Sequence, residues 1–130
     1  MSPASPDLVY VVDDDEDVRY SVKILLERAG FAVRDFPDAQ SCLAAASDSE
    51  QFGCLLVDMH MPGLSGVDLL RRLKALGVQV PAIVMSGNYH LESELAGLDV
   101  FHVLSKPAPT EDLLGWVGKA CAQARASAGD

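Results

Sequence analysis

Four apolar runs of this chain each end in polar side chains that could carry chemistry. The runs and the groups that follow them are, in chain order, Leu8–Val12 with Asp13 and Asp14, Cys54–Val57 with Asp58, Ala82–Met85 with Ser86, and Val103–Ser105 with Lys106. Because the carboxyl ends of parallel strands meet at one edge of a sheet, we expect these groups to form one site. Carboxylates gathered there repel one another at neutral pH unless a cation or an ammonium group lies among them.

The residue types in this set suit phosphoryl transfer to a carboxylate. Asp58 stands at a strand end before a glycine-containing loop, where it can act as a nucleophile toward phosphorus. Asp13 and Asp14 would hold a divalent cation together with Asp58, and such a set of oxygen ligands suits Mg²⁺. The cation would offset the repulsion between the carboxylates and the incoming group. Lys106 and Ser86 would contact phosphoryl oxygens.

Apolar periodicity predicts the elements that position these groups. Strands are predicted at Leu8–Val12, Phe31–Phe36, Cys54–Val57, Ala82–Met85 and Val100–Leu104. Helical spacing predicts helices that begin near Asp17, Asp38, Val67 and Thr110, with about two further turns within 89–98. The alternation indicates an α/β fold with a parallel sheet, helices on both faces and right-handed crossovers. We expect one domain over residues 7–126, between a disordered tail at 1–6 and a C-terminal tail at 127–130.

Composition narrows the class of protein. Ten basic residues against nineteen acidic ones give a net charge of −9, which argues against direct binding to nucleic acid or to an anionic membrane. No apolar run approaches membrane-spanning length, and no signal-peptide pattern opens the chain. Cys42, Cys54 and Cys121 are widely spaced and are interpreted as buried thiols in a reducing compartment. We therefore expect a cytoplasmic protein.

The motifs together resemble those of response regulator receiver domains, which have a flavodoxin-like (βα)5 fold. They are Val11–Asp15, Leu56–Gly66, Ile83–Gly87 and Ser105–Pro107, and their order and spacing extend the resemblance over nearly the whole chain. The resemblance implies a phosphorylation switch in two-component signalling, with a sensor histidine kinase or a phosphotransfer protein as donor. It implies a downstream effector protein or domain and leaves a homodimer open. It does not imply an enzyme beyond self-phosphorylation and self-dephosphorylation.

The resemblance also implies a role for each site residue. Asp58 would become the aspartyl phosphate. Asp14 and Asp58 would ligate Mg²⁺ directly, Asp13 would act largely through water, and the backbone carbonyl of His60 would complete the protein ligands. Ser86 and Lys106 would contact the phosphoryl group. The peptide bond between Lys106 and Pro107 is similar to one that is usually cis in this family, which would aim the lysine inward.

The chain departs from the family pattern near its carboxyl-terminal third. Val103 stands three positions before the lysine, where receivers commonly carry the aromatic residue that couples phosphorylation to the output face. Phe101 would point to the same side of a regular strand, farther from the site. The interval from Ser86 to Lys106 is also short, which predicts a shortened fourth helix and a nonstandard output surface.

His60 and Asn88 fall at positions that resemble the family's tuning positions for phosphoryl lifetime.

Other interpretations fit these residues to different degrees. A receiver-like interaction module that phosphorylation does not regulate remains open, favoured by the altered switch region. An EF-hand fails because Val18 and Ile24 replace its glycine and its final acid. A haloacid-dehalogenase-type phosphatase would match Asp13-x-Asp15, but 130 residues leave little room for a cap. A zinc site is disfavoured because His60, His90 and His102 lack the spacing of zinc ligands. A flavin or nucleotide carrier is disfavoured because no glycine-rich phosphate loop follows the first strand. We expect Asp15, Glu16 and Asp17 to be helix-start acids.

Overall fold

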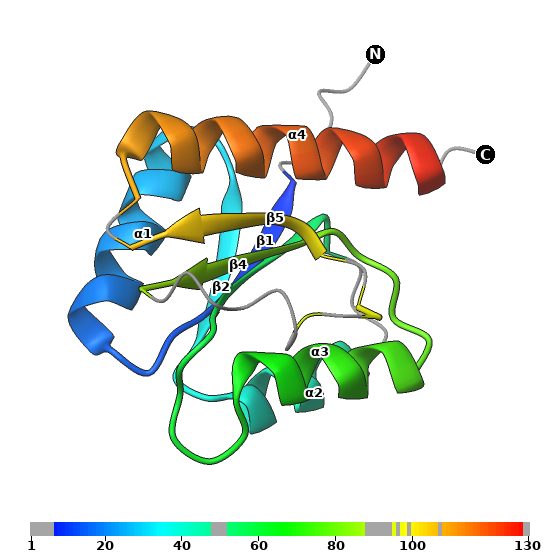
Figure 1. The fold of residues 1–130 in the computed structure, drawn as a ribbon. Helices are drawn as coiled ribbons and strands as arrows, with labels where there is room; N and C mark the ends of the chain where they lie inside the picture. Colours follow the sequence, from blue (N-terminus) through cyan, green and yellow to red (C-terminus); the bar gives the residue numbers. More distant parts are fainter. Residues whose placement is uncertain are drawn as a thin grey trace.

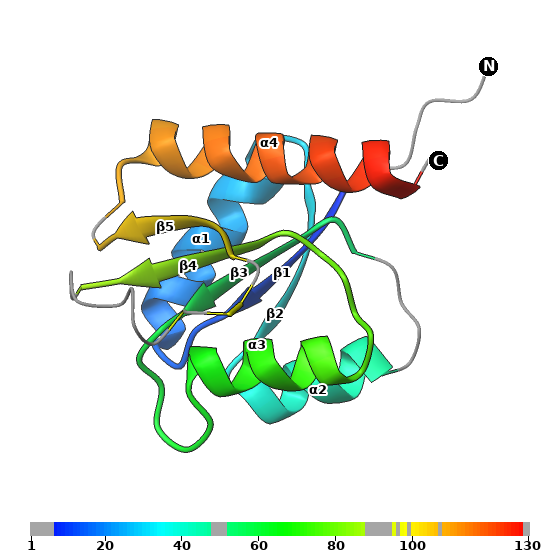
Figure 2. The same cartoon turned by 45° about the vertical axis from the view of Figure 1, so that its right-hand side comes forward.

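The chain folds into a three-layer α/β structure in a computed structural model that describes residues 7–47, 52–87, 95, 97–98, 100–106 and 108–128. Five parallel strands form one sheet in the order β2-β1-β3-β4-β5. Helices α1 and α4 cover one face of the sheet, and α2 and α3 cover the other (Figures 1 and 2). The elements are β1 (Leu8–Val12), α1 (Glu16–Arg28), β2 (Ala32–Phe36), α2 (Ala39–Ser47), β3 (Cys54–Asp58), α3 (Gly66–Ala75), β4 (Ala82–Ser86), β5 (Val100–Ser105) and α4 (Thr110–Ala128). This arrangement confirms the predicted fold class.

Local sequence signals explain where the helices begin and end. Asp15 caps α1, since its carboxylate accepts hydrogen bonds from the backbone N–H groups of Asp17 and Val18. The prediction that Asp15 and its acidic neighbours are helix-start residues is therefore confirmed. Gly30 has φ +102° and ends the helix. The backbone N–H of Phe31 still bonds to α1, so β2 starts one residue later than predicted.

Two apolar layers hold the helices on the sheet. The three central strands are almost wholly buried, as expected for strands covered on both faces. Alternate residues of β1, β3 and β4 pack toward α2 and α3, and the residues between them pack toward α1 and α4. The free thiols of Cys42, Cys54 and Cys121 are buried in these layers, as predicted. The sheet is thus a rigid support for the side chains at its carboxyl edge.

A β-bulge in β5 changes one expectation from the sequence. Ala82 pairs with Val100 but Ile83 pairs with His102, so Phe101 is an extra residue in the ladder. Phe101 packs on the α4 side against Trp116, whereas Val103 pairs with Val84 of the opposite layer. Phe101 and Val103 therefore do not share a side of the sheet, because the bulge breaks the regular alternation.

The predicted fourth helix, within 89–98, falls largely outside the described residues, and so do Asn88 and Pro107. The label α4 belongs to the C-terminal helix, which the sequence predicted from Thr110. Among the helices of the described residues, none combines the length and the apolar character that crossing a membrane would require.

Candidate functional site

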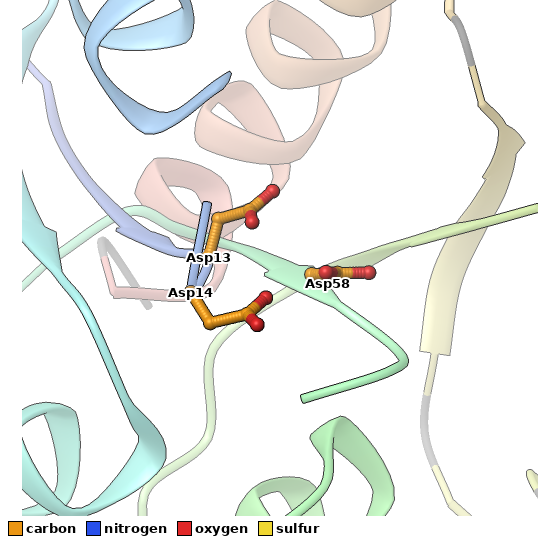
Figure 3. A group of neighbouring side chains, drawn as sticks. All are labelled: Asp13, Asp14 and Asp58. Carbon is orange, nitrogen blue, oxygen red and sulfur yellow. The ribbon is translucent and has the colours of Figure 1, made fainter. Parts of the chain in front are cut away.

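Three carboxylates meet at the carboxyl edge of the sheet (Figure 3). Asp13 and Asp14 follow the end of β1, and Asp58 ends β3, the neighbouring strand. One carboxylate oxygen of each residue lies within 4.8 Å of those of the other two. Asp13 and Asp58 are buried, while Asp14 is exposed to solvent. The structure therefore brings together the three acids that the sequence predicted as a set.

Backbone hydrogen bonds continue past the strand ends and place these residues in register. The N–H of Asp13 donates to the carbonyl of Phe36 at 3.2 Å, and the N–H of Met59 donates to the carbonyl of Met85 at 2.9 Å. The N–H of Lys106 donates to the carbonyl of Ser86 at 2.8 Å. Asp13, Lys106 and the residue after Asp58 are consequently held by the sheet and not only by their own loops.

Lys106 supplies the ammonium that the acidic cluster requires. Its Nζ lies 3.1 Å from Oδ1 of Asp58 and 3.4 Å from Oδ2 of Asp13. Burial lowers the pKa of Lys106, but the hydrogen bond to Asp58 and the charge of Asp13 outweigh it and raise this pKa above its ordinary value. The lysine is therefore a fixed positive charge directed at the predicted nucleophile.

Asp13 has an electrostatic environment that favours an additional cation. Burial raises the pKa of its carboxyl, and the nearby charge of Asp58 acts in the same direction. The hydrogen bond from the N–H of Asp15 and the charge of Lys106 offset this effect only in part. A buried carboxylate with a raised pKa, beside two more carboxylates, fits an oxygen-ligated divalent cation such as Mg²⁺.

Ser86 and His60 differ in their exposure to solvent. Ser86 ends β4, is buried, and pairs with Ser105 of β5 in the sheet register. The His60 side chain is exposed, and the backbone N–H of His60 donates to Oδ1 of Asp58 at 3.3 Å. His60 thus contacts the acidic cluster through its backbone N–H, whereas the resemblance assigned its backbone carbonyl to the metal.

The loop after Asp58 is closed against the start of α3. Ser65 and Asp68 form a capping box, in which each side chain accepts a hydrogen bond from the other residue's backbone N–H. The N–H of Gly66 donates to the carbonyl of Met59 at 3.2 Å. A Cβ on Gly66 would lie 2.8 Å from the carbonyl oxygen of Asp58, so only a glycine allows this approach.

Sequence reasoning did not identify Arg19, whose guanidinium also contacts the site. Its Nη1 donates to the backbone carbonyl of Asp13 at 2.8 Å, and its Nε donates to Asp35 at 3.0 Å. Its position two residues after the acidic segment Asp13–Asp17 was the available signal. An arginine in the first turns of an amphipathic helix normally indicates only a solvated face.

Comparisons with known proteins agree with this geometry. A family model described as the response regulator receiver domain matches residues 9–117. The transcriptional regulatory protein FixJ of Bradyrhizobium diazoefficiens is 38% identical over 122 residues, which are 92% of this chain and 59% of that protein. A crystal structure of FixJ-N has a TM-score of 0.82 and 30% identity, with coverage of 92% of this chain and 96% of that one.

A second solved structure extends the likeness. A low-resolution structure of the response regulator StyR has a TM-score of 0.85 and 32% identity, with coverage of 97% of this chain and 64% of that one. The chain spans about half the length of the curated relatives that it matches. The chain therefore belongs to the response regulator receiver domain family, the phosphorylation switches of two-component signalling.

Proposed function

We propose that Asp58 is the phosphoacceptor of this receiver domain and that the reaction depends on Mg²⁺. A carboxylate oxygen of Asp58 attacks the phosphorus of a donor, a new P–O bond forms, and the bond between phosphorus and the leaving group breaks. For a histidine kinase or a phosphotransfer protein, the leaving group is the imidazole of the phosphohistidine. The product is an acyl phosphate on Asp58, which water then hydrolyses slowly.

The other site residues prepare this transfer. Asp14 and Asp58 would hold Mg²⁺ directly, Asp13 largely through water, and the carbonyl of His60 would add a further oxygen. The metal would supply charge neutralisation between the carboxylates and the phosphoryl group. Lys106 and Ser86 would bind phosphoryl oxygens, the lysine as a point charge and the serine as a hydrogen-bond donor. His60 and Asn88 would tune the lifetime of the acyl phosphate.

The contact between Lys106 and Asp58 is the observation that carries the proposal. A buried carboxylate at a strand end has an ammonium at 3.1 Å and two further carboxylates beside it. A purely structural ion pair would not need the additional acids, because each adds repulsion. The arrangement instead supplies a nucleophile, a cation site and a phosphoryl-binding cation in one place.

Incubation with a small phosphodonor and MgCl2, followed by intact-mass measurement, tests the assignment. We expect a mass increase of one phosphoryl group in the natural sequence and none in Asp58→Asn. The matched control is Asp17→Asn, which removes an exposed helix-start acid outside the cluster. Asp17→Asn should be phosphorylated normally, and chelation of Mg²⁺ should abolish the signal. Phosphorylation that persists in Asp58→Asn contradicts the proposal.

One observation favours a second candidate, a receiver-shaped interaction module that does not respond to phosphorylation. Val103 occupies the position of the usual switch aromatic and is 41% exposed, and Phe101 packs on the other side of the sheet. Neither side chain can couple Ser86 to the surface in the manner of the family's aromatic switch. A beryllofluoride complex whose backbone amide NMR spectrum matches that of the free protein beyond the site would support the passive module.

We place the domain in the cytoplasm, where a sensor kinase or a phosphotransfer protein would phosphorylate it. Its output would be a downstream effector protein or an effector domain, as the names of the relatives suggest: FixJ is a transcriptional regulatory protein. The net charge of −9 argues that this domain does not itself bind nucleic acid. A homodimer of this domain would be compatible with an effector protein or an effector domain as the output.

A further inference from the structure

We propose that Arg19 is a positioning residue that fixes the peptide between Asp13 and Asp14 and thereby sets the affinity of the acidic cluster for Mg²⁺. The inference rests on the proposed function. Arg19 lies in the first turns of α1, and its backbone N–H donates to the carbonyl of Asp15 at 2.9 Å. Its side chain reaches back from the helix to the end of β1.

The guanidinium joins three elements at this point. Nη1 donates to the backbone carbonyl of Asp13 at 2.8 Å, while Nε donates to Oδ2 of Asp35 on β2 at 3.0 Å. The Arg19 side chain is only 15% exposed, so solvent does not compete freely for these donors. A planar guanidinium with two fixed partners has a defined orientation, which a single flexible ammonium would lack.

The carbonyl that Arg19 holds belongs to the peptide that links Asp13 and Asp14. Rotation of this peptide changes ψ of Asp13 and φ of Asp14, and so redirects the Asp14 side chain relative to the carboxylate of Asp13. Ligand oxygens must be correctly placed for Mg²⁺, which demands near-ideal octahedral geometry. Groups that orient metal ligands without touching the metal commonly change its affinity by about 10- to 100-fold.

The electrostatic effect of Arg19 has the opposite sign, which allows a decisive test. A positive charge next to a cation site repels the cation, so its removal should tighten Mg²⁺ binding if charge alone matters. Loss of positioning should instead weaken binding. Lys23 is the matched control, because it lies on the same helix, carries the same charge and pairs with the same Asp35, at 3.5 Å.

Isothermal titration calorimetry with MgCl2 on the full chain measures the Mg²⁺ affinity directly. We expect Arg19→Ala to weaken it about tenfold, and Lys23→Ala to leave it unchanged or slightly tighter. Arg19→Lys keeps the repulsive charge but loses the fork of donors, so its Mg²⁺ affinity should also fall below that of the natural sequence. If a urea titration shows that Arg19→Ala is unfolded, Arg19→Lys carries the test. It should then bind Mg²⁺ a few-fold more weakly than the natural sequence does.

Several results would overturn the inference. Binding by Arg19→Ala as tight as in the natural sequence, or tighter, would show that charge dominates. An equal loss of Mg²⁺ affinity in Lys23→Ala would indicate a general loss of stability. Unaltered Mg²⁺ binding by a folded Arg19→Lys would show that the paired donors of the guanidinium are not needed. If the natural sequence binds Mg²⁺ and is phosphorylated, these results remove only the role of Arg19. If it binds no Mg²⁺, the proposed function falls with it.

Discussion

Gly66 connects the packing of α3 to the position of the proposed phosphoacceptor, so Gly66→Ala should disturb both. A Cβ at this position would lie 2.8 Å from the carbonyl oxygen of Asp58 and 3.1 Å from Cα of Met59. Both neighbours are backbone atoms, which cannot swing aside as a flexible side chain can. Ordinary contacts between a C–H group and a carbonyl oxygen have C···O distances of about 3.3 Å or more, so α3 or the end of β3 must shift by about 0.5 Å.

The expected size of the effect follows from this overlap. Overpacking in a well-packed region costs about 1–3 kcal/mol, and the better helix propensity of alanine returns at most about 1 kcal/mol. We expect a net loss of about 1–2 kcal/mol, which lowers Tm by about 4–8 °C for a domain of this size. We expect the end of β3 to take up part of this shift, so Asp58 moves with its carbonyl and the rate of phosphorylation should also fall, by about tenfold.

Thermal unfolding and the rate of phosphoryl incorporation measure the two parts of this prediction. Gly115→Ala is the matched control, since Gly115 lies within α4 and a Cβ there would meet nothing within 4 Å. Gly115→Ala should raise Tm by about 2–4 °C and leave the rate unchanged. The reasoning is refuted if Gly66→Ala keeps the Tm and the rate of the natural sequence while Gly115→Ala behaves as expected.

Two further predictions concern charge. Because burial raises the pKa of Asp13, the folded state disfavours its carboxylate at neutral pH, so Asp13→Asn should raise the urea midpoint in the absence of Mg²⁺. Mg²⁺ at about ten times its Kd should raise the free energy of unfolding of the natural sequence by about 1.4 kcal/mol and that of Asp13→Asn by less. Equal stabilisation of both proteins would contradict a role for Asp13 in Mg²⁺ binding. Burial against Trp116 and the charge of Lys119 lower the pKa of His102, so the unfolded chain binds the proton more readily. The contribution of His102 to stability is therefore complete above its unfolded pKa of about 6.5 and is lost at lower pH. The difference between the urea midpoints at acidic and neutral pH should be smaller in His102→Gln than in the natural sequence. An unchanged difference would refute this reasoning.

The amino-acid sequence alone predicted the strands and the order of the polar groups at their ends. Continuous apolar runs such as Leu8–Val12 predict strands buried on both faces, and the carboxyl ends of parallel strands must share one edge. Asp13, Asp58 and Lys106 could therefore be assigned to one site before their distances were known. Asp15 was likewise predicted as a helix-start residue because capping depends on neighbours in the sequence.

Tertiary structure decided the features that depend on contacts between distant segments. The position of Phe101 follows from a bulge in the pairing of β4 with β5, which no periodicity within β5 reveals. Arg19 has the sequence pattern of a solvated helix residue, and its bonds to Asp13 and Asp35 exist only because α1 packs beside β1 and β2. Local sequence determines which elements form and which groups end them, whereas the relative placement of the elements determines which of those groups can touch.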